Sequence, residues 1–300
     1  MEQSQTMTRP IDWKNVITIS GFHVMAVVAV TYMITVRFSV ETLILGAVWF
    51  TLCGLSITAG YHRLFTHRAY KASRPLEFLY LLFGAASLQN SALTWATDHR
   101  VHHAHTDHDI DPYSTVKGFW WAHIGWIMRK SPPHRDPKIT TDLAANPLVR
   151  LQDRYYYPLA IAVGSILPLG LGALWGDALG ALLVAGFLRT VLQWHATFCI
   201  NSLAHTVGSR HFGEDSTARD FWPIALITFG EGFHNFHHTF QSDYRNGVKW
   251  YHYDPTKWFV RLLSFVGVTW DLKRAPAPAI ARVLEQESGS RTSTLSDQGT

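Results

Sequence analysis

The sequence predicts an all-α integral membrane protein, in which four transmembrane helices carry a helical cap on the cytoplasmic side. Two observations predict this fold class. Hydrophobic residues make up 47% of the 300-residue chain, and they are bunched into long runs instead of recurring at amphipathic spacing. Positively charged residues collect in one long segment between two of these runs, as is typical of a cytoplasmic loop.

Four apolar runs are each close to the roughly 20 residues needed to cross the hydrocarbon core. We expect transmembrane helices at about 15–36, 42–61, 155–175 and 178–200. The first run has no small-residue cleavage site after it, so we expect it to remain as a span and not to be removed as a signal peptide. Residues 1–14 then form a cytoplasmic N-terminal segment.

The distribution of charge orients these spans. The link between the first two is only RFSVE, and the link after the third is little more than Gly176 and Asp177, whereas many Lys and Arg residues lie between the second and the third span. By the positive-inside rule that segment and both termini are cytoplasmic. The polar residues 275–300 are expected to be a disordered tail, which leaves 15–274 as a single membrane-bound domain.

A fifth apolar run, at about 76–95, is interpreted as an interfacial helix that does not cross the membrane. If it crossed, the histidines of HRLFTH (62–67) and HRVHH (99–103) would lie on opposite faces of the bilayer. The polar residues Ser87, Gln89 and Asn90 also interrupt it, and a spanning helix would have to hide them from lipid. Every histidine cluster then emerges on the cytoplasmic side.

The composition excludes other classes of protein. The net charge of +4 is mild, and no basic tract studded with aromatic residues is present, so nucleic-acid binding is not expected. Cys53 and Cys199 lie inside predicted spans, where they build neither a disulfide framework nor a cysteine metal cluster.

The histidines form the pattern that carries chemistry. HxxHH occurs twice, at 99–103 and at 234–238, and residues i, i+3 and i+4 share one face of a helix. Asn201 and His205 stand at i, i+4 at the end of the fourth span, whereas His62 and His67 at i, i+5 lie about 140° apart on an α-helix and would more naturally reach two metals than one. Neutral imidazole suits zinc, copper, iron and nickel. Nine histidines and one asparagine are too many ligands for a single ion and suit two: His62, His67, His99, His102, His103, Asn201, His205, His234, His237 and His238.

Single histidines outside these clusters, such as His23, His123 and His195, are expected to be ordinary interfacial residues. The acidic residues Asp107 and Asp111, near Pro112, are expected to form a turn. One or two of the carboxylates in this stretch would accept the second N–H of a ligand histidine, as metal-bound imidazoles usually require.

At this point the motifs resemble a known family. HRLFTH, DHRVHH followed by DIDPYS, GFWWAHIGW, NSLAH and GEGFHNFHH, in this order over residues 40–272, are similar to those of the membrane-bound fatty acid desaturases, in particular the Δ9 acyl-CoA (stearoyl-CoA type) branch. The resemblance implies a mushroom-shaped fold with four membrane helices under a cytosolic cap. It also implies a di-iron centre held by the ten residues above, with Asn201 acting through a water. The implied reaction is an oxidoreductase reaction that uses O2 and two electrons to insert a cis double bond.

The resemblance also implies contacts with the substrate. Asn90, Trp95 and Asp98 match positions near the second histidine cluster, and Arg129 with Lys130 match a basic pair that meets the phosphates of the carrier. Animal acyl-CoA enzymes typically carry Arg where this chain has Thr97, and Trp where it has Phe198 on the wall of the acyl tunnel.

Several alternatives stay open at the level of the sequence. The acyl carrier is CoA, acyl carrier protein or a membrane lipid, and neither the chain length nor the position of the double bond can be read from it. No haem module or four-cysteine iron–sulfur motif is present, so electrons must come from a separate ferredoxin, rubredoxin or cytochrome b5 with its reductase. The alternative functions are a related di-iron alkyl hydroxylase and a non-catalytic, histidine-rich membrane metal transporter or sensor. We expect the bacterial inner membrane in preference to the endoplasmic reticulum.

Overall fold

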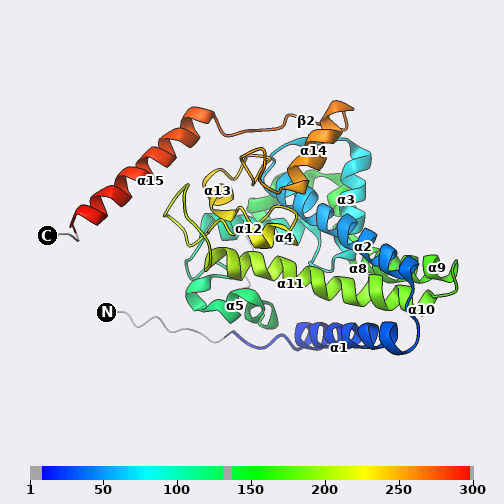
Figure 1. Ribbon diagram of the computed structural model, residues 1–300. Helices are drawn as coiled ribbons and strands as arrows, with labels where there is room; N and C mark the ends of the chain where they lie inside the picture. Colours follow the sequence, from blue (N-terminus) through cyan, green and yellow to red (C-terminus); the bar gives the residue numbers. More distant parts are fainter. Residues whose placement is uncertain (1–8, 131–136, 298–300) are drawn as a thin grey trace.

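The computed structural model describes residues 9–130 and 137–297, with side chains described as far as Glu287. Within these residues, four helices are long and apolar enough to cross a membrane, as predicted. They are Trp13–Thr35, Val40–Thr66, Tyr156–Ala173 and Ala178–His205. Figure 1 shows the turns between the first two and between the last two at one end of the bundle, with the cap helices gathered at the other.

The first span is a single α-helix, and the other three are each made of several segments. They are α1 (Trp13–Thr35); α2 (Val40–Leu55) with the π-helical η1 (Ser56–Thr66); α8 (Tyr156–Ile161), η5 (Ala162–Ile166) and α9 (Leu167–Ala173); and α10 (Ala178–Ala181), η6 (Leu182–Leu188), α11 (Arg189–Ser202) and η7 (Leu203–His205). The second and fourth helices continue five residues beyond the predicted ends at 61 and 200. This extension carries their last histidines into the cap.

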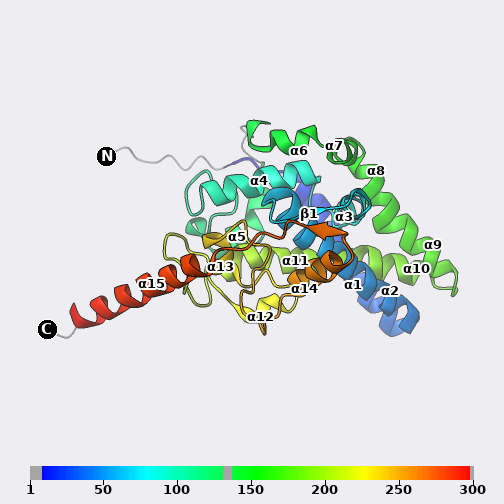
Figure 2. The same cartoon turned by 90° about the horizontal axis from the view of Figure 1, so that it is seen from above.

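The cap consists of the remaining, mostly short elements. They are β1 (Lys71–Ala72) paired antiparallel with β2 (Thr269–Trp270), α3 (Arg74–Ala86), α4 (Ala92–Ala104), η2 (Thr115–Lys117), α5 (Phe119–His123), η3 (Gly125–Met128), η4 (Pro137–Thr140), α6 (Thr141–Ala145), α7 (Pro147–Arg154), α12 (Trp222–Ala225), α13 (His234–Thr239) and α14 (Pro255–Phe265). Figure 2, turned by 90°, shows α4 and α13 approaching the ends of the long helices from different sides.

The run at 76–95 is expected from the sequence to be one helix, but the structure has two helices there, α3 and α4. It breaks at residues 87–91, where Leu88 and Asn90 take positive φ values of 52° and 73° and Ser91 caps α4 by accepting the N–H of Thr94. With 13 residues, α3 is about 20 Å long, which is short of the roughly 30 Å hydrocarbon core. The prediction that this run is not a fifth span agrees with the four spans found.

Helix α3 packs closely against the second span through two glycines. A Cβ on Gly60 would lie 2.7 Å from the Cβ of Tyr80, and a Cβ on Gly84 would lie 2.3 Å from the ring of Tyr61. Both tyrosines are buried in the main core cluster. The contact therefore fixes η1, which carries His62 and leads directly into His67, against the cap.

The end of the chain differs from the expected disordered tail. Helix α15 (Ala277–Asp297) extends away from the body of the protein (Figure 1). Its described part, APAIARVLEQE, is rich in Ala, Arg, Leu, Glu and Gln, which favour helix in the absence of packing.

At the end of the bundle away from the cap, one buried carboxylate holds the helices together. Asp177 accepts hydrogen bonds from Tyr32 Oη (2.8 Å), Thr42 Oγ1 (2.5 Å) and the N–H of Gly180 (3.2 Å), and thereby joins three spans. We predict that Asp177→Ala leaves these donors without an acceptor and destabilises the protein by about 2 kcal/mol or more. Thermal unfolding in detergent measures the loss, with the exposed Asp109→Ala as control. Equal melting temperatures for the two variants would contradict the prediction.

Candidate metal centre

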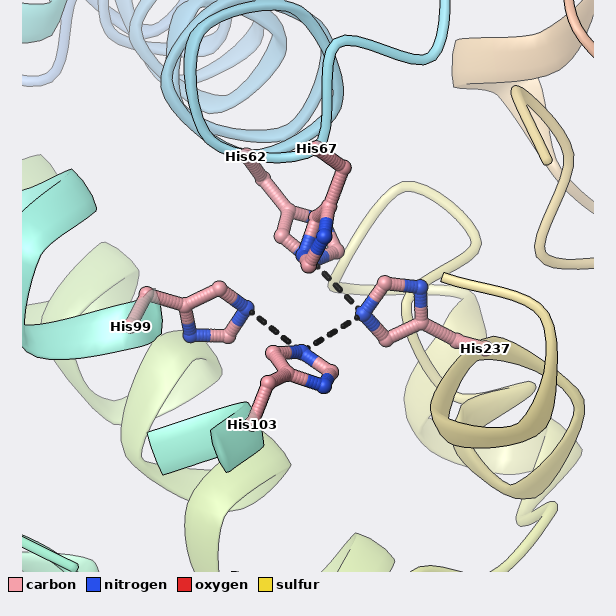
Figure 3. Close-up of side chains that lie close together, drawn as sticks. All are labelled: His62, His67, His99, His103 and His237. Carbon is pink, nitrogen blue, oxygen red and sulfur yellow. Dashed lines mark hydrogen bonds between the residues drawn. The ribbon is translucent and has the colours of Figure 1, made fainter. Parts of the chain in front are cut away.

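The nine predicted histidine ligands come together in two groups. The first contains His62 and His67 from the end of the second span, His99 and His103 from α4, and His237 from α13, and their candidate ligand atoms lie within 4.8 Å of one another. Figure 3 shows these five imidazoles pointing toward one another from three separate elements. The second group contains His102, His205, His234 and His238, within the same limit.

The π-helical form of η1 corrects one expectation from the sequence. On an α-helix His62 and His67 would point in different directions, but the N–H of His67 bonds to the carbonyl of His62 at 3.1 Å, five residues back. This i→i+5 pattern adds residues to the turn and brings positions five apart toward one side. Their ring centroids lie 4.7 Å apart, so both belong to the first group.

Each HxxHH triplet contributes to both groups. On α4, His99 and His103 face the first group and His102 faces the second, whereas on α13 His237 faces the first, and His234 and His238 face the second. The i, i+4 pair of each triplet thus shares a group, and the middle histidine belongs to the other. The two groups are neighbours because two short helices each supply both.

The contacts between the imidazoles are not those of a hydrogen-bonded network. In the first group the Nε2 of His237 lies 3.0 Å from the Nε2 of both His62 and His103, and that of His103 is also 3.1 Å from that of His99. A ring nitrogen has a single in-plane site, either a lone pair or a proton, so no nitrogen satisfies two such contacts. The second group repeats the pattern, since the Nε2 atoms of His234 and His238 each meet two others at 3.1–3.4 Å.

These separations fit a shared metal ion. Nitrogen ligands about 2.1 Å from one ion and at right angles to each other lie about 3.0 Å apart. Burial, reinforced by the neighbouring imidazoles, keeps the pKa of six of these histidines well below its ordinary value, so each offers a neutral lone pair: His67, His99, His103, His234, His237 and His238. Donor chemistry, spacing and protonation state all suit a metal such as iron or zinc.

The outward nitrogens of four histidines are held by hydrogen bonds. His62 Nδ1 lies 2.8 Å from Glu231, His102 Nδ1 lies 3.0 Å from Asp111, and His99 Nδ1 lies 3.0 Å from the hydroxyl of Tyr113. His205 Nδ1 meets Thr217 Oγ1 at 2.8 Å, and that hydroxyl donates to Asp107 at 2.7 Å. Such partners fix the tautomer and direct Nε2 inward. Two carboxylates of the acidic stretch thus act as predicted, one of them through a threonine.

Two of these carboxylates are held as anions. Burial opposes ionisation of Glu231, but Arg63 and His62 outweigh it and bring its pKa down to about 2. Burial likewise opposes ionisation of Asp111, but His102 and the N–H of Tyr113 keep its pKa below the usual range. Arg63 is itself buried between Glu231 and Asp254, at 2.9 and 3.0 Å. Sequence reasoning missed Arg63 and Glu231, although Glu231 lies within the quoted GEGFHNFHH motif.

A cavity of about 210 Å³ lies beside both groups. His62 and His99 of the first group and His234 of the second line it. The predicted residues Asn90, Trp95, Asp98, Phe198 and Asn201 line it as well. Whether Asn201 is a ligand through a water stays a prediction.

Two hydrogen bonds between lining residues fix the wall of the cavity. Gln89 Nε2 donates to Thr197 Oγ1 at 3.0 Å, and Trp95 Nε1 donates to Gln89 Oε1 at 3.4 Å. These bonds tie the break between α3 and α4 to α11. They keep the ring of Trp95 4.8 Å from that of His99.

Arg129 and Lys130, the expected carrier contacts, are not part of the cavity lining. Arg129 Nη1 donates to the carbonyl of Arg9, and the N–H of Lys130 donates to that of Pro10, so this pair joins the N-terminal segment to the cap. Lys14, five residues after Arg9, lines the cavity and donates to Tyr157 Oη at 2.8 Å. In the sequence, only its place before the first span marks Lys14.

Four membrane-length helices and two groups of converging imidazoles beside an apolar cavity define a histidine-rich membrane protein with a candidate dinuclear metal centre. Residues 41–265 match the fatty acid desaturase family, and the chain belongs to that family. It is similar to the probable acyl-CoA desaturase of Schizosaccharomyces pombe (43% identical over 95% of this chain) and to acyl-CoA desaturase 1 of Saccharomyces cerevisiae (40% over 92%). It is also similar to the sn-1 stearoyl-lipid 9-desaturase of Anabaena variabilis (36% over 90%).

The chain spans only part of the two yeast proteins. It corresponds to 60% of the S. pombe protein and 54% of the S. cerevisiae protein, but to 97% of the Anabaena protein. Two carriers, CoA and a lipid, appear among the names of these relatives. Family membership alone therefore does not choose the carrier.

The depressed histidine pKa values predict how the metal-free protein responds to acid. An unfolded histidine takes up a proton near pH 6.5 and these buried ones do not, so the unfolded state binds more protons and stability falls as pH drops below about 6.5. Asp220 acts in the opposite direction, because burial raises its pKa to about 6 and folding then favours its protonated form. It is one group, whereas six histidines lose stability in acid. We expect the melting temperature of chelator-treated protein to fall between pH 7.5 and 5.5. A flat profile would contradict the neutral state of the histidines.

Proposed function

We propose that the protein is a membrane-bound desaturase that converts a saturated acyl chain, carried by CoA, into a cis-Δ9-unsaturated one. The balanced reaction takes CH2–CH2, O2, two electrons and two protons to CH=CH and two waters. The observation that carries the proposal is the contact between two histidine groups and one long cavity, through His62, His99 and His234. An alkyl chain in that cavity would lie directly beside both groups.

The nine histidines would hold two iron ions, with five nitrogen ligands for one and four for the other. Asn201 lines the cavity one helical turn before His205 and would add a ligand to the second ion through a water. When bound, the iron pair would supply the O2-dependent oxidation that removes hydrogen from two adjacent carbons. The outward hydrogen bonds to Glu231, Asp111, Tyr113 and Thr217 would keep the ligands in place.

The residues of the chain would position the acyl group. A saturated chain offers no polar handle near its middle, so its place can be measured only from the head group by rigid confinement. The bridge from Trp95 through Gln89 to Thr197 stiffens the wall beside His99. Confinement in a bent cavity here would hold the two carbons in the conformation that gives a cis product.

The carrier would bind where the cavity meets the N-terminal segment. Lys14 and Asn90 lie there, and Arg129 and Lys130 are joined to residues just before Lys14, so positive charge is available for the phosphates of CoA. Acyl carrier protein and a membrane lipid are the other carriers that this site could accept. The relatives named as acyl-CoA desaturases favour CoA.

The orientation follows from the same charges. We infer that the cap and both termini are cytoplasmic, in a bacterial inner membrane in preference to the endoplasmic reticulum. A separate ferredoxin, rubredoxin or cytochrome b5 with its reductase would deliver the electrons from that side. Metal transport is disfavoured because both groups lie in the cap and at the last residues of the spans, whereas a transporter places its ligands near mid-membrane.

The first test of function is the fatty-acid profile of a desaturase-deficient host that expresses this chain. We expect cis-Δ9 16- and 18-carbon acids to appear, and to be absent with His234→Ala. Lys14→Ala should raise the apparent KM for acyl-CoA without moving the double bond, with the exposed Lys71→Ala as control. Hydroxylated acids in place of unsaturated ones would support the hydroxylase alternative instead. No change in the lipids would reject both reactions.

The metal content gives a second prediction. Protein from iron-replete cells should hold about two metal ions per chain, and zinc can replace ferrous iron during overexpression because it binds nitrogen ligands more tightly. His103→Ala and His238→Ala should each lower the content by metal analysis, and the exposed His108→Ala should not. A single equivalent that survives either ligand change would contradict the dinuclear centre.

A further inference from the structure

Three histidines outside the metal centre are linked to one another in series. The Nε2 of His23 on α1 lies 2.9 Å from the Nε2 of His195 on α11, and the Nδ1 of His195 lies 3.1 Å from the Nε2 of His123 on α5. Helix α11 contacts both α1 and α5 (Figure 1). We call this series the histidine chain.

The histidine chain is built differently from the metal groups. There, each ring directs one nitrogen to a common point, whereas here His195 uses its two opposite nitrogens to bridge two neighbours. The nitrogens therefore do not converge on one ion. The arrangement instead ties three helices together.

Both ends of the histidine chain reach the backbone of residues that line the cavity. The Nδ1–H of His23 donates to the carbonyl of Ile19 at 2.7 Å. At the other end, Ser202 Oγ lies 2.9 Å from both His123 Nδ1 and the carbonyl oxygen of Phe198, and its one proton serves one of these two acceptors while the histidines are neutral. Ile19 and Phe198 both face the cavity.

The rings of the histidine chain also hold the side chain of Phe198. The rings of His123 and His195 meet it edge-on, with centroids 5.7 and 5.8 Å away and interplanar angles of 73° and 81°. Phe198 is buried in a cluster with Ile19 and Trp194. Backbone and ring of Phe198 are thus fixed by the same set of contacts.

We propose that His23, His195 and His123 are positioning residues that fix the cavity wall at Phe198, and thereby determine which acyl chain lengths are accepted. The proposal rests on the proposed function, because it assigns the acyl chain to this cavity. Packed interiors resist changes of even one methylene, so a wall braced on three helices discriminates chain length more sharply than a free phenyl ring. None of the three histidines lines the cavity or belongs to either metal group.

The test compares the ratio of 16- to 18-carbon unsaturated products in the desaturase-deficient host. His195→Leu removes both bridges at similar volume and should change this ratio by about threefold or more, within the range that one or two methylenes produce in apolar pockets. His195→Gln keeps a donor and an acceptor and should lie closer to the wild type. His211→Leu, an exposed histidine of the cap, is the control. General loss of folded protein lowers both products alike and leaves their ratio unchanged.

A double variant tests whether the effect passes through Phe198. Phe198→Ala should change the product ratio by itself, and His195→Leu added to it should produce little further change, because the braced ring is then absent. Additive effects would show that the two residues act independently and would overturn the proposal. Should His195→Leu fail to fold, Ser202→Ala replaces it. This variant removes the hydroxyl that links His123 to Phe198, and its product ratio is compared with that of Phe198→Ala in the same way.

The outcomes separate this inference from the proposed function. A wild-type protein that makes no unsaturated product overturns the proposed function. Hydrogen exchange then tests the positioning role of the histidine chain without any product. His195→Leu should accelerate amide exchange in residues 119–128 but not in 71–86. Unchanged exchange in 119–128 would overturn the inference. If the wild type is active, equal product ratios in wild type and His195→Leu overturn the inference and leave the desaturase assignment intact.

Discussion

The site depends on one property of imidazole: a hydrogen bond to one ring nitrogen from outside orients the ring and directs its other nitrogen inward. In this protein the outward nitrogens of His62, His99, His102 and His205 are each held by a carboxylate or a hydroxyl of the cap. Burial keeps His99, His103 and His237 neutral, since a dry site disfavours the charged form of the ring. Without these partners, nitrogens 3.0 Å apart would repel one another and the rings would rotate away.

The fold orients the ligands by placing several of them at the ends of long, rigid helices. The second span continues as a π-helix into the cap, and the fourth span ends at His205, so the two helices that supply the other ligands, α4 and α13, need only be short. Arg63 lies one residue after a ligand and is buried between Glu231 and Asp254. A charge there is tolerated because it is paired twice. Through Glu231 and Asp254 it connects the second span to the segment just before α13 and to the start of α14.

The four spans follow from long apolar runs, and the histidine spacing identified all nine imidazoles that converge. From the sequence, residues 87–91 are predicted to be a polar interruption within one helix. The break is not predicted, because residue type does not signal a positive φ at Leu88 and Asn90 as clearly as a glycine would. The contact of Arg129 and Lys130 with the carrier stays a prediction, and the structure adds the backbone pairing of this segment with residues 9–11. That pairing is long-range and invisible to local patterns.

What the sequence determined by itself is the set of chemical groups and their local direction: apolar length fixes the spans, and the HxxHH spacing fixes which imidazoles share a helix face. Tertiary structure decided how these groups are divided. His62 and His67 share a group because η1 winds with i→i+5 bonds, and each triplet is split because α4 and α13 approach from different sides. It also joined His23, His195 and His123, which lie 72 or more residues apart along the chain. The physical reason is that spacing sets angles only within one helix, whereas distances between helices are set by packing.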